Sequence, residues 1–379
     1  MGMMGRTPFA GVAWQVLQYL EGLRRLGWEV SYVEDTGDWP YDPVRQTVTD
    51  DSAYPVSYIG RLMDWLGLPD GWAYVAPDGG AHGPLGSALP GLYRAVDVLV
   101  NLTGATVLRE QHLAVPARLY VETDPVLAQV EVARGERFTI ELLEAHTHHF
   151  TYAENLGAPD CGVPLDRFDY LTTRPPVVID WWRGDGAERR ADGRFTTVSS
   201  WEQRGKDAEW RGETYYWSKH REFMKVVDLP RRVSQPLELA LACDDQRVLA
   251  LLRSRGWRVI DGVELSRDIA PYRDYIRGSR AEFTVAKDQY VRTRTGWFSD
   301  RSACYLAAGK PVVTQDTGFG CALPVGEGLL AFATVEDAAA AIEAVAGDPV
   351  RHSEAARGLA DEHFAAERVL GDLIAAAGL

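Results

Sequence analysis

The chain has 379 residues, of which 46% are hydrophobic and 25% charged, as is typical of a globular protein with more than one hydrophobic core. Its net charge of −14, with Lys and Arg spread along the sequence, argues against a nucleic-acid partner, so an anionic ligand must be held by a few local cations. No apolar run reaches the roughly 20 residues that span a bilayer, no signal peptide is recognisable and the four cysteines form no CxxC pair. We therefore expect a cytoplasmic protein with reduced thiols and no membrane span.

The first predicted element is an amphipathic helix from Ala13 to Leu26, which stops at Gly27. Because so little sequence precedes this helix, the first strand of the fold is expected to be very short or truncated. The β-type segments that follow are near-continuous apolar runs, which favour a parallel sheet covered on both faces. They span residues 28–35, 72–76, 97–103, 118–123 and 149–154.

A second series of elements follows the paired prolines Pro175 and Pro176 and the polar stretch 183–193, which we interpret as a domain junction. Its predicted strands span residues 194–200, 236–242, 257–262, 281–287, 311–315 and 329–334, and an Ala-rich helix follows from about Val335. The alternation of strand and helix in both halves predicts an α/β protein with two doubly wound, Rossmann-like domains facing across a cleft. The predicted domains are residues 1–175 and 176–350.

Ser299, Asp300 and Arg301 form an unusually polar start to an apolar helix, which runs through Gly309-Lys310-Pro311 into a predicted strand. Free backbone N–H groups at that end, together with Ser299 and Arg301, predict a cradle for an anion. The alternative is an ordinary capped helix with a solvated arginine.

A second candidate is the segment 199–223, which follows the first strand of the second series. Arg204 and Lys206 flank a glycine there, and Lys219 stands at a predicted helix start, so all three are candidate phosphate ligands. The alternative is a polar surface loop in which Lys206 pairs with a neighbouring carboxylate.

Loops after the strands of the first series offer further candidates. Arg6, Gly11 and Val12 belong to the loop that precedes the first predicted helix, while His82 and Asp124 follow predicted strands. A histidine or a carboxylate with a pKa near neutrality suits a general base, so His82 and Asp124 are the predicted catalytic residues. Each is also compatible with a turn or capping role.

A metal site is not predicted. His146, His148 and His149 lie close in sequence, but their side chains diverge at these spacings and no HExxH frame is present. We expect structural roles for them, although His149 is retained as a candidate pointing into the cleft. The stretch Glu122–Asp124 mimics a DxD metal motif but stands in the wrong layout for one.

The order of motifs resembles the glycosyltransferases of the GT-B type, in particular the GT4-like group 1 enzymes. The similarity rests on the loop GRTPFAG with a helix ending LRRLG before WEV, and on a Gly-rich turn and helix ending AAGKPVV before a polar loop. It implies that a nucleotide diphosphate sugar binds the second domain and that the acceptor binds the first, on the side of Arg6, Gly11, Val12 and His149. It also implies that neither metal nor another cofactor is required. It also implies that residues 351–379 form a helix crossing back to the first domain, and that Asp316, Thr317 and Gly318 lie on the donor side.

The sequence departs from this family at two positions. A glutamate that binds the nucleotide ribose in many GT-B enzymes is replaced by Cys304, and the second glutamate of the retaining enzymes is missing near Gly296. We therefore assign Asp300 toward the ribose and Ser299 and Arg301 toward phosphate. The stereochemical outcome stays open.

The predicted function is transfer of a sugar from a nucleotide diphosphate sugar to a hydroxyl or amine of a small molecule. Aromatic residues in the first half suggest a flat acceptor such as a natural-product aglycone, although they fit a core equally well. They are Trp39, Tyr41, Tyr54, Tyr58, Trp65 and Trp72. The alternatives are a nucleotide-sugar 2-epimerase of the same architecture and a non-catalytic nucleotide-sugar-binding protein, which the missing glutamate would favour.

Overall fold

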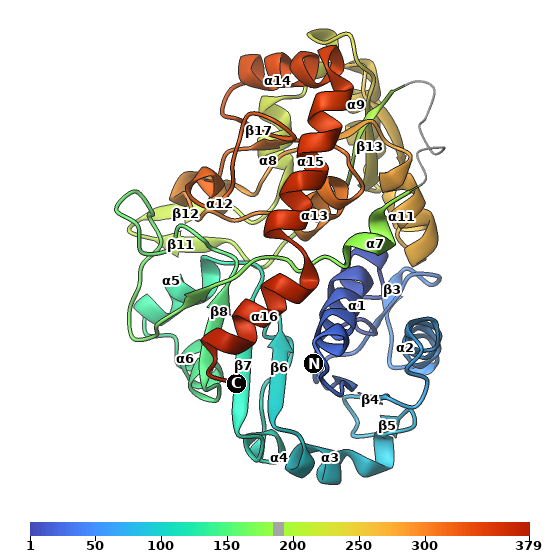
Figure 1. The fold of residues 1–379 in the computed structure, drawn as a ribbon, viewed down its shortest axis with the longest axis vertical. Coiled ribbons are helices and arrows are strands. Elements are labelled where there is room, and N and C mark those ends of the chain that lie inside the picture. Colours follow the sequence, from blue (N-terminus) through green and yellow to red (C-terminus); the bar gives the residue numbers. More distant parts are fainter. Residues whose placement is uncertain (185–192) are drawn as a thin grey trace.

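The structure, a computed structural model, describes residues 1–184 and 193–379 and consists of two lobes, each with parallel β-strands and covering helices (Figure 1). Most of the polar stretch predicted as the domain junction lies outside the described residues. Within the described ranges, no helix is both long and apolar enough to cross a bilayer.

The lower lobe of Figure 1 contains two small sheets rather than one. The first has the order β1 (Tyr32–Glu34), β4 (Trp72–Val75) and β5 (Ala81–His82), and the second β6 (Val98–Leu102), β7 (Ala117–Glu122), β8 (His148–Thr151) and β9 (Leu171–Thr172). All these pairs are parallel except β4–β5. The remaining elements of this lobe are α1 (Ala10–Arg25), the hairpin β2 (Tyr41–Asp42) and β3 (Thr47–Val48), α2 (Ala53–Leu66), α3 (Leu89–Ala95), α4 (Glu110–Leu113), α5 (Leu127–Ala133), α6 (Arg137–Glu144) and α7 (Ile179–Trp182).

The upper lobe contains one six-stranded parallel sheet. Its order is β14 (Arg258–Asp261), β13 (Leu237–Ala242), β10 (Phe195–Ser200), β15 (Ala281–Thr284), β16 (Val312–Gln315) and β17 (Leu329–Phe332). The chain leaves β10 in one direction toward β13 and β14, and later builds β15 to β17 on the other side. This reversal creates a switch point at the carboxyl ends of β10 and β15, where open α/β sheets bind ligands. Every residue of β15 and β16 is buried, as their apolar runs predict.

Helices and one hairpin surround this sheet. They are β11 (Ala208–Trp210), β12 (Glu213–Tyr215), α8 (His220–Lys225), α9 (Gln246–Ser254), α10 (Gly262–Leu265), α11 (Ile269–Arg277), α12 (Asp288–Thr293), α13 (Asp300–Ala307) and α14 (Val335–Gly347).

The C-terminal helices connect the lobes. α15 (Pro349–His363) lies along α13 in the upper lobe, and α16 (Ala366–Ala376) crosses to pack on α1 in the lower lobe (Figure 1). The crossing is fixed by Val177, whose N–H donates to the Phe364 carbonyl over 2.7 Å and whose carbonyl accepts from the Ala366 N–H over 2.9 Å. The predicted return of the C-terminal helix to the N-terminal half is therefore confirmed.

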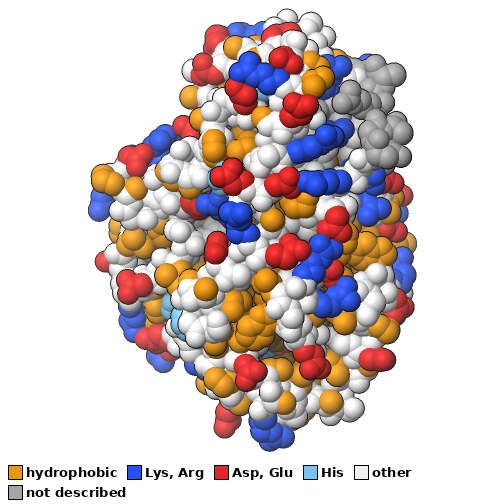
Figure 2. Space-filling view, viewed as in Figure 1, with side chains coloured by type: hydrophobic (Ala, Val, Ile, Leu, Met, Phe, Trp, Pro, Cys, Tyr) orange, Lys and Arg blue, Asp and Glu red, His pale blue; other side chains and the backbone are white. Residues whose placement is uncertain are grey.

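The visible surface reflects this layout. On the face shown in Figure 2, acidic and basic side chains alternate over the region of α15. Hydrophobic side chains gather lower down, where α16, β6 and α1 meet in Figure 1.

Candidate functional site

A cavity of about 370 Å³ lies between the two lobes, at the carboxyl ends of β7, β10, β13 and β15. The lower lobe contributes the first turns of α1 and the residues after β7, and the upper lobe contributes the ends of β10 and β13 and the start of α13. The cavity therefore sits at the switch point of the six-stranded sheet, where ligands are expected in this class of fold.

Lys219, which precedes α8, places an amine without an ion-pair partner at this cavity. The residue is only 8% exposed, and its Nζ lies 5.9 Å from the centroid of the Trp297 ring. Within the described part of the chain, Nζ has no hydrogen-bond acceptor and no carboxylate within 4.0 Å. Burial, with repulsion from Arg301 and Lys287, holds the pKa of Lys219 well below its ordinary value. A bound anion would supply the missing countercharge.

Lys287, just beyond β15, forms an ion pair with Asp124 that links the lobes. Its Nζ donates to Asp124 Oδ1 over 2.7 Å, and the Tyr290 hydroxyl bonds to the same oxygen. Burial lowers the pKa of Lys287 to about 8, although Asp124 opposes the shift. Burial alone would raise the pKa of Asp124, but the charges of Lys287 and Lys206 outweigh it and hold this pKa below its usual value. Asp124 is thus an ionised, paired carboxylate and a weak base.

Asp300 differs from Asp124 in that its pKa is raised rather than lowered. At the first residue of α13, its Oδ1 accepts a hydrogen bond from Gln15 Nε2 of α1 over 3.1 Å. Burial raises the pKa of Asp300 to about 6, although bonds from Gln15 and the Tyr152 hydroxyl favour the ionised form. The Tyr152 hydroxyl in turn lies 3.0 Å from that of Tyr19. A carboxyl group that titrates near pH 6 in a cavity is suited to accept a proton from a substrate hydroxyl.

Arg301 also lines the cavity, and its predicted contact with phosphate stays a prediction. Its Nε donates to Glu282 over 2.6 Å, Nη1 to the Val198 carbonyl over 2.7 Å and Nη2 to Thr284 Oγ1 over 2.9 Å. Every guanidinium nitrogen thus already binds the protein, and the side chain fixes α13 to β10 and β15. Beside it, Ser299 lines the cavity with a hydroxyl that makes no helix-capping bond.

Cys304 belongs to the contact between the lobes. Its Sγ accepts from Gln18 Nε2 over 3.8 Å, and Gln18 Oε1 accepts from Trp182 Nε1 over 2.9 Å. The position that carries a ribose-binding glutamate in the enzymes this sequence resembles is therefore occupied by a buried thiol that contacts α1.

Arg204 and Lys206 do not line the cavity, and their predicted phosphate contacts stay predictions. The Arg204 side chain is 86% exposed and pairs with Glu202. Lys206 is exposed, with its Nζ 4.8 Å from the centroid of the Trp217 ring. Both residues lie in the segment between β10 and β11.

The predicted loop 316–318 supports the cavity wall without lining it. Thr317 Oγ1 donates to the Trp297 carbonyl over 2.6 Å, and the Thr317 carbonyl accepts from the Gly296 N–H over 2.7 Å. Asp316 Oδ1 accepts from the Gly318 N–H over 2.8 Å. These bonds hold the turn before α13, so the three residues act on the site through Trp297 and Gly296.

On the lower-lobe side, Gly11 and Val12 line the cavity where the sequence predicts. Arg6 lies on the surface instead, paired with Asp38 over 2.8 Å. Its backbone N–H, however, binds Glu34, which helps to shape the loop leading to Gly11.

The two predicted histidines lie elsewhere. His82 is on β5, with its ring centroid 6.2 Å from that of Tyr74, and does not line the cavity. His149 is on β8, where Nε2 lies 2.9 Å from the Leu143 carbonyl oxygen, and burial lowers its pKa. The structure therefore places neither histidine at the cavity, and a catalytic role of His82 stays a prediction. Within the described ranges, no group of three or more His, Cys, Asp or Glu side chains is placed to hold a metal ion.

Several cavity residues were not predicted from the sequence. Lys287 stands three residues after β15, so the rule that ligands meet strand ends points to it. Gln15 and Trp297 carried no such signal, because their roles depend on how the lobes meet. Trp297 Nε1, for instance, donates to the Thr123 carbonyl of the opposite lobe over 2.8 Å.

The sequence matches no protein-family model and no curated protein. Its fold, in contrast, is similar to several solved glycosyltransferases. AviGT4, involved in avilamycin A biosynthesis, aligns with a TM-score of 0.55 and 14% identity over 97% of this chain and 89% of that one. Anabaena Alr3699/HepE in complex with UDP and glucose aligns at 0.56 and 12%, over 97% and 95% of the two chains. The α-glucosyltransferase AGT in complex with UDP aligns at 0.59 and 11%, over 99% and 98%.

These alignments extend over nearly the whole chain and include both lobes. The fold is therefore GT-B, as the sequence resemblance implied.

Proposed function

We propose that this protein is a glycosyltransferase that moves a sugar from a nucleotide diphosphate sugar to a small-molecule acceptor. The observation that carries the proposal is Lys219, a buried amine that lines the cavity of a GT-B fold and has no ion-pair partner in the described part of the chain. A diphosphate beside Lys219 would gain charge-assisted hydrogen bonds and would offset the cost of burying the lysine. Lys287 adds a second positive charge at the same wall.

The catalytic step follows from where charge develops. The bond between the sugar and the diphosphate breaks, so negative charge grows on the departing phosphate, and fixed cations stabilise it. Lys219 and Lys287 supply that charge with little reorganisation because they are buried and packed against Trp297 and Trp217.

Asp300 is the proposed base for the acceptor. It is the first residue of α13 and accepts a hydrogen bond from the Gln15 side chain of the lower lobe, whose Gly11 and Val12 also line the cavity. An acceptor hydroxyl bound there could transfer its proton to Asp300 as it attacks the sugar. No metal or other cofactor is part of this proposal.

UDP is the first nucleotide to test, because it is present in two of the three structures named above. The experiment is a thermal-shift screen of UDP-, dTDP- and GDP-linked sugars, since a ligand of the native state raises the melting temperature. It is followed by an assay for released nucleotide diphosphate, with and without a panel of flat hydroxylated acceptors such as aglycones. Slow release without acceptor and faster release with one is the expected result.

A non-catalytic binding protein is the competing reading, favoured by Cys304 in place of a glutamate. Stabilisation by one sugar nucleotide without any release over the acceptor panel would establish that reading. Absence of stabilisation by every sugar nucleotide would contradict both.

A further inference from the structure

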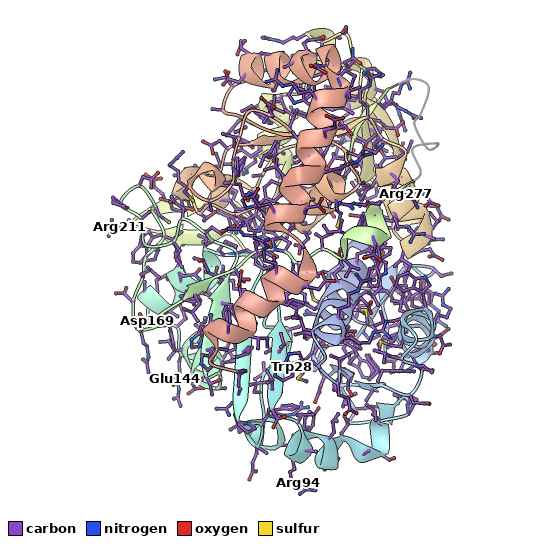
Figure 3. All side chains as sticks on the ribbon, viewed as in Figure 1. Trp28, Arg94, Glu144, Asp169, Arg211 and Arg277 are labelled. Carbon is purple, nitrogen blue, oxygen red and sulfur yellow. The ribbon has the colours of Figure 1, made fainter. Side chains whose placement is uncertain are left out.

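A second cavity, of about 350 Å³, lies inside the lower lobe between the two small sheets. One wall is formed by α1 through Leu20 and Leu23, and another by Trp28 and Val30 ahead of β1. The opposite wall is β6 and the turn before it. Trp28 is labelled in Figure 3 near β6 and α1. We refer to this cavity as the sheet groove.

Two open strand edges face the sheet groove. Within the described chain, β1 pairs only with β4, and β6 pairs with no strand other than β7. The edges of the two sheets that border the groove therefore retain unpaired backbone groups. Open edges of this kind are normally paired or covered in a native fold.

The backbone of Met1 already pairs with one of these edges. The Met1 amine donates to the Val100 carbonyl over 2.5 Å, and the Met1 carbonyl accepts from the Leu102 N–H over 3.0 Å. In a parallel ladder, the N–H and the carbonyl of one residue bond to the two residues that flank its partner on the neighbouring strand. Met1 bonds to Val100 and Leu102 in this way, so its partner on β6 is Asn101. Met1 thus occupies the position of the last paired residue of a strand parallel to β6.

The position of the Met1 amine is unfavourable for a free terminus. The amine is buried, and its burial lowers its pKa to about 5, although the nearby Glu34 carboxyl favours the charged form. An amide at the same position would donate the same hydrogen bond without a charge to desolvate.

We propose that the sheet groove is the docking site of an additional β-strand, formed by residues of the same polypeptide that precede Met1. In the Met1–Asn101 register, the residues ahead of Met1 lie beside Val100, Leu99 and Val98. The strand joins the two sheets into one with the order β5, β4, β1, new strand, β6, β7, β8 and β9.

We assign the strand to the same polypeptide because the Met1 amine lies within the ladder along β6. A strand continuous with Met1 needs one peptide bond at the amine, whereas a strand from another chain would have to end against it. The chemistry of the occupant also follows from the walls. Since α1 covers one face and α3 and the turn before β6 cover the other, the strand should be an uninterrupted aliphatic run without proline or charge.

The inference is independent of the proposed function, and its tests do not use activity. The first test is mass spectrometry of the N-terminal peptide of the protein isolated from its own cells. We expect a peptide that begins ahead of Met1 and contains an aliphatic run. A native terminus at Met1, or at Gly2 after removal of the methionine, would overturn the proposal.

The second test is hydrogen exchange on the same native protein. Amides of the residues directly ahead of Met1 should be protected to the same degree as those of β6, because they would lie within the sheet. Exchange at the rate of an unstructured peptide would show that these residues exist but do not fill the groove.

A comparison of two recombinant forms gives a third readout. The form starting at Met1 should melt at a lower temperature than the extended form, or fail to fold. Its stability relative to the extended form should rise between about pH 5 and pH 8, because only its amine must lose a proton on folding. Glu34, whose burial raises its pKa to about 7, faces the amine but is present in both forms.

Two results of that comparison would contradict the proposal. One is equal melting temperatures of the two forms. The other is a dimer of the Met1 form that is as stable as the extended monomer, since a second copy would then fill the groove. A control extension with aspartate at its central position should lose the stabilisation.

Discussion

Replacing Lys219 by methionine separates ligand binding from folding. Methionine keeps most of the side-chain length and removes the ammonium. Hydrogen bonds to charged groups contribute about 1.5–3 kcal/mol each, so loss of one to the diphosphate should weaken UDP binding roughly 10- to 150-fold. The free protein should keep or raise its stability, because the pKa of Lys219 is depressed in the fold and its charged form is therefore unfavourable below pH 10.

The assay is isothermal titration calorimetry with UDP at pH 7.5, together with the melting temperature of the free protein. Arg204→Met is the matched control, because Arg204 is 86% exposed, pairs with Glu202 and does not line the cavity. We expect the control to bind UDP as the unmodified protein does. If Lys219→Met keeps UDP affinity within twofold, the cavity does not hold the diphosphate at Lys219 and the reasoning is refuted.

Three further predictions concern the turn and first residues of α13. Asp300→Asn should reduce turnover by about 10²- to 10⁴-fold and remove a limb of the pH–rate profile near pH 6. It should also stabilise the protein at pH 8, because the raised pKa makes ionised Asp300 unfavourable above pH 6. Denaturant unfolding at pH 5 and pH 8 measures this second effect. Arg301→Met should cost about 3–5 kcal/mol of unfolding free energy by leaving Glu282 buried without its partner, and an unchanged denaturation midpoint would contradict the bonding described above. Gly296→Ala should lower the melting temperature, since Gly296 has φ +78° and an added Cβ would lie 2.5 Å from Asn155 N; circular dichroism on heating tests this.

The strands of the upper lobe were predictable because their signal is local. Apolar runs such as 281–287 and 311–315 are buried over their whole length in β15 and β16, and a run of that kind has few other stable arrangements. Short pairs such as β11–β12 were missed, because strands of three residues are too short to show a periodicity.

The site was only partly predictable, for a different reason. Residues assigned by their place after a strand, such as Asp124, do lie at the cavity. What each side chain does there depends on partners far away in sequence. Arg301 turns inward because Glu282 and Thr284 face it, and Asp124 is a weak base because Lys287 lies against it. None of these three partners can be inferred from the sequence motif that contains Arg301 or Asp124.

The hydrogen bonds that join the lobes around the cavity also bear on the speed of binding. Gln15 to Asp300, Lys287 to Asp124 and Trp297 to the Thr123 carbonyl each connect one lobe to the other across the cavity wall. A ligand the size of a sugar nucleotide must part some of these contacts to reach Lys219, so its association should be slower than diffusion allows. In stopped-flow experiments, the observed rate constant of binding would then reach a plateau as the nucleotide concentration rises. The plateau value would equal the rate constant at which the two lobes separate.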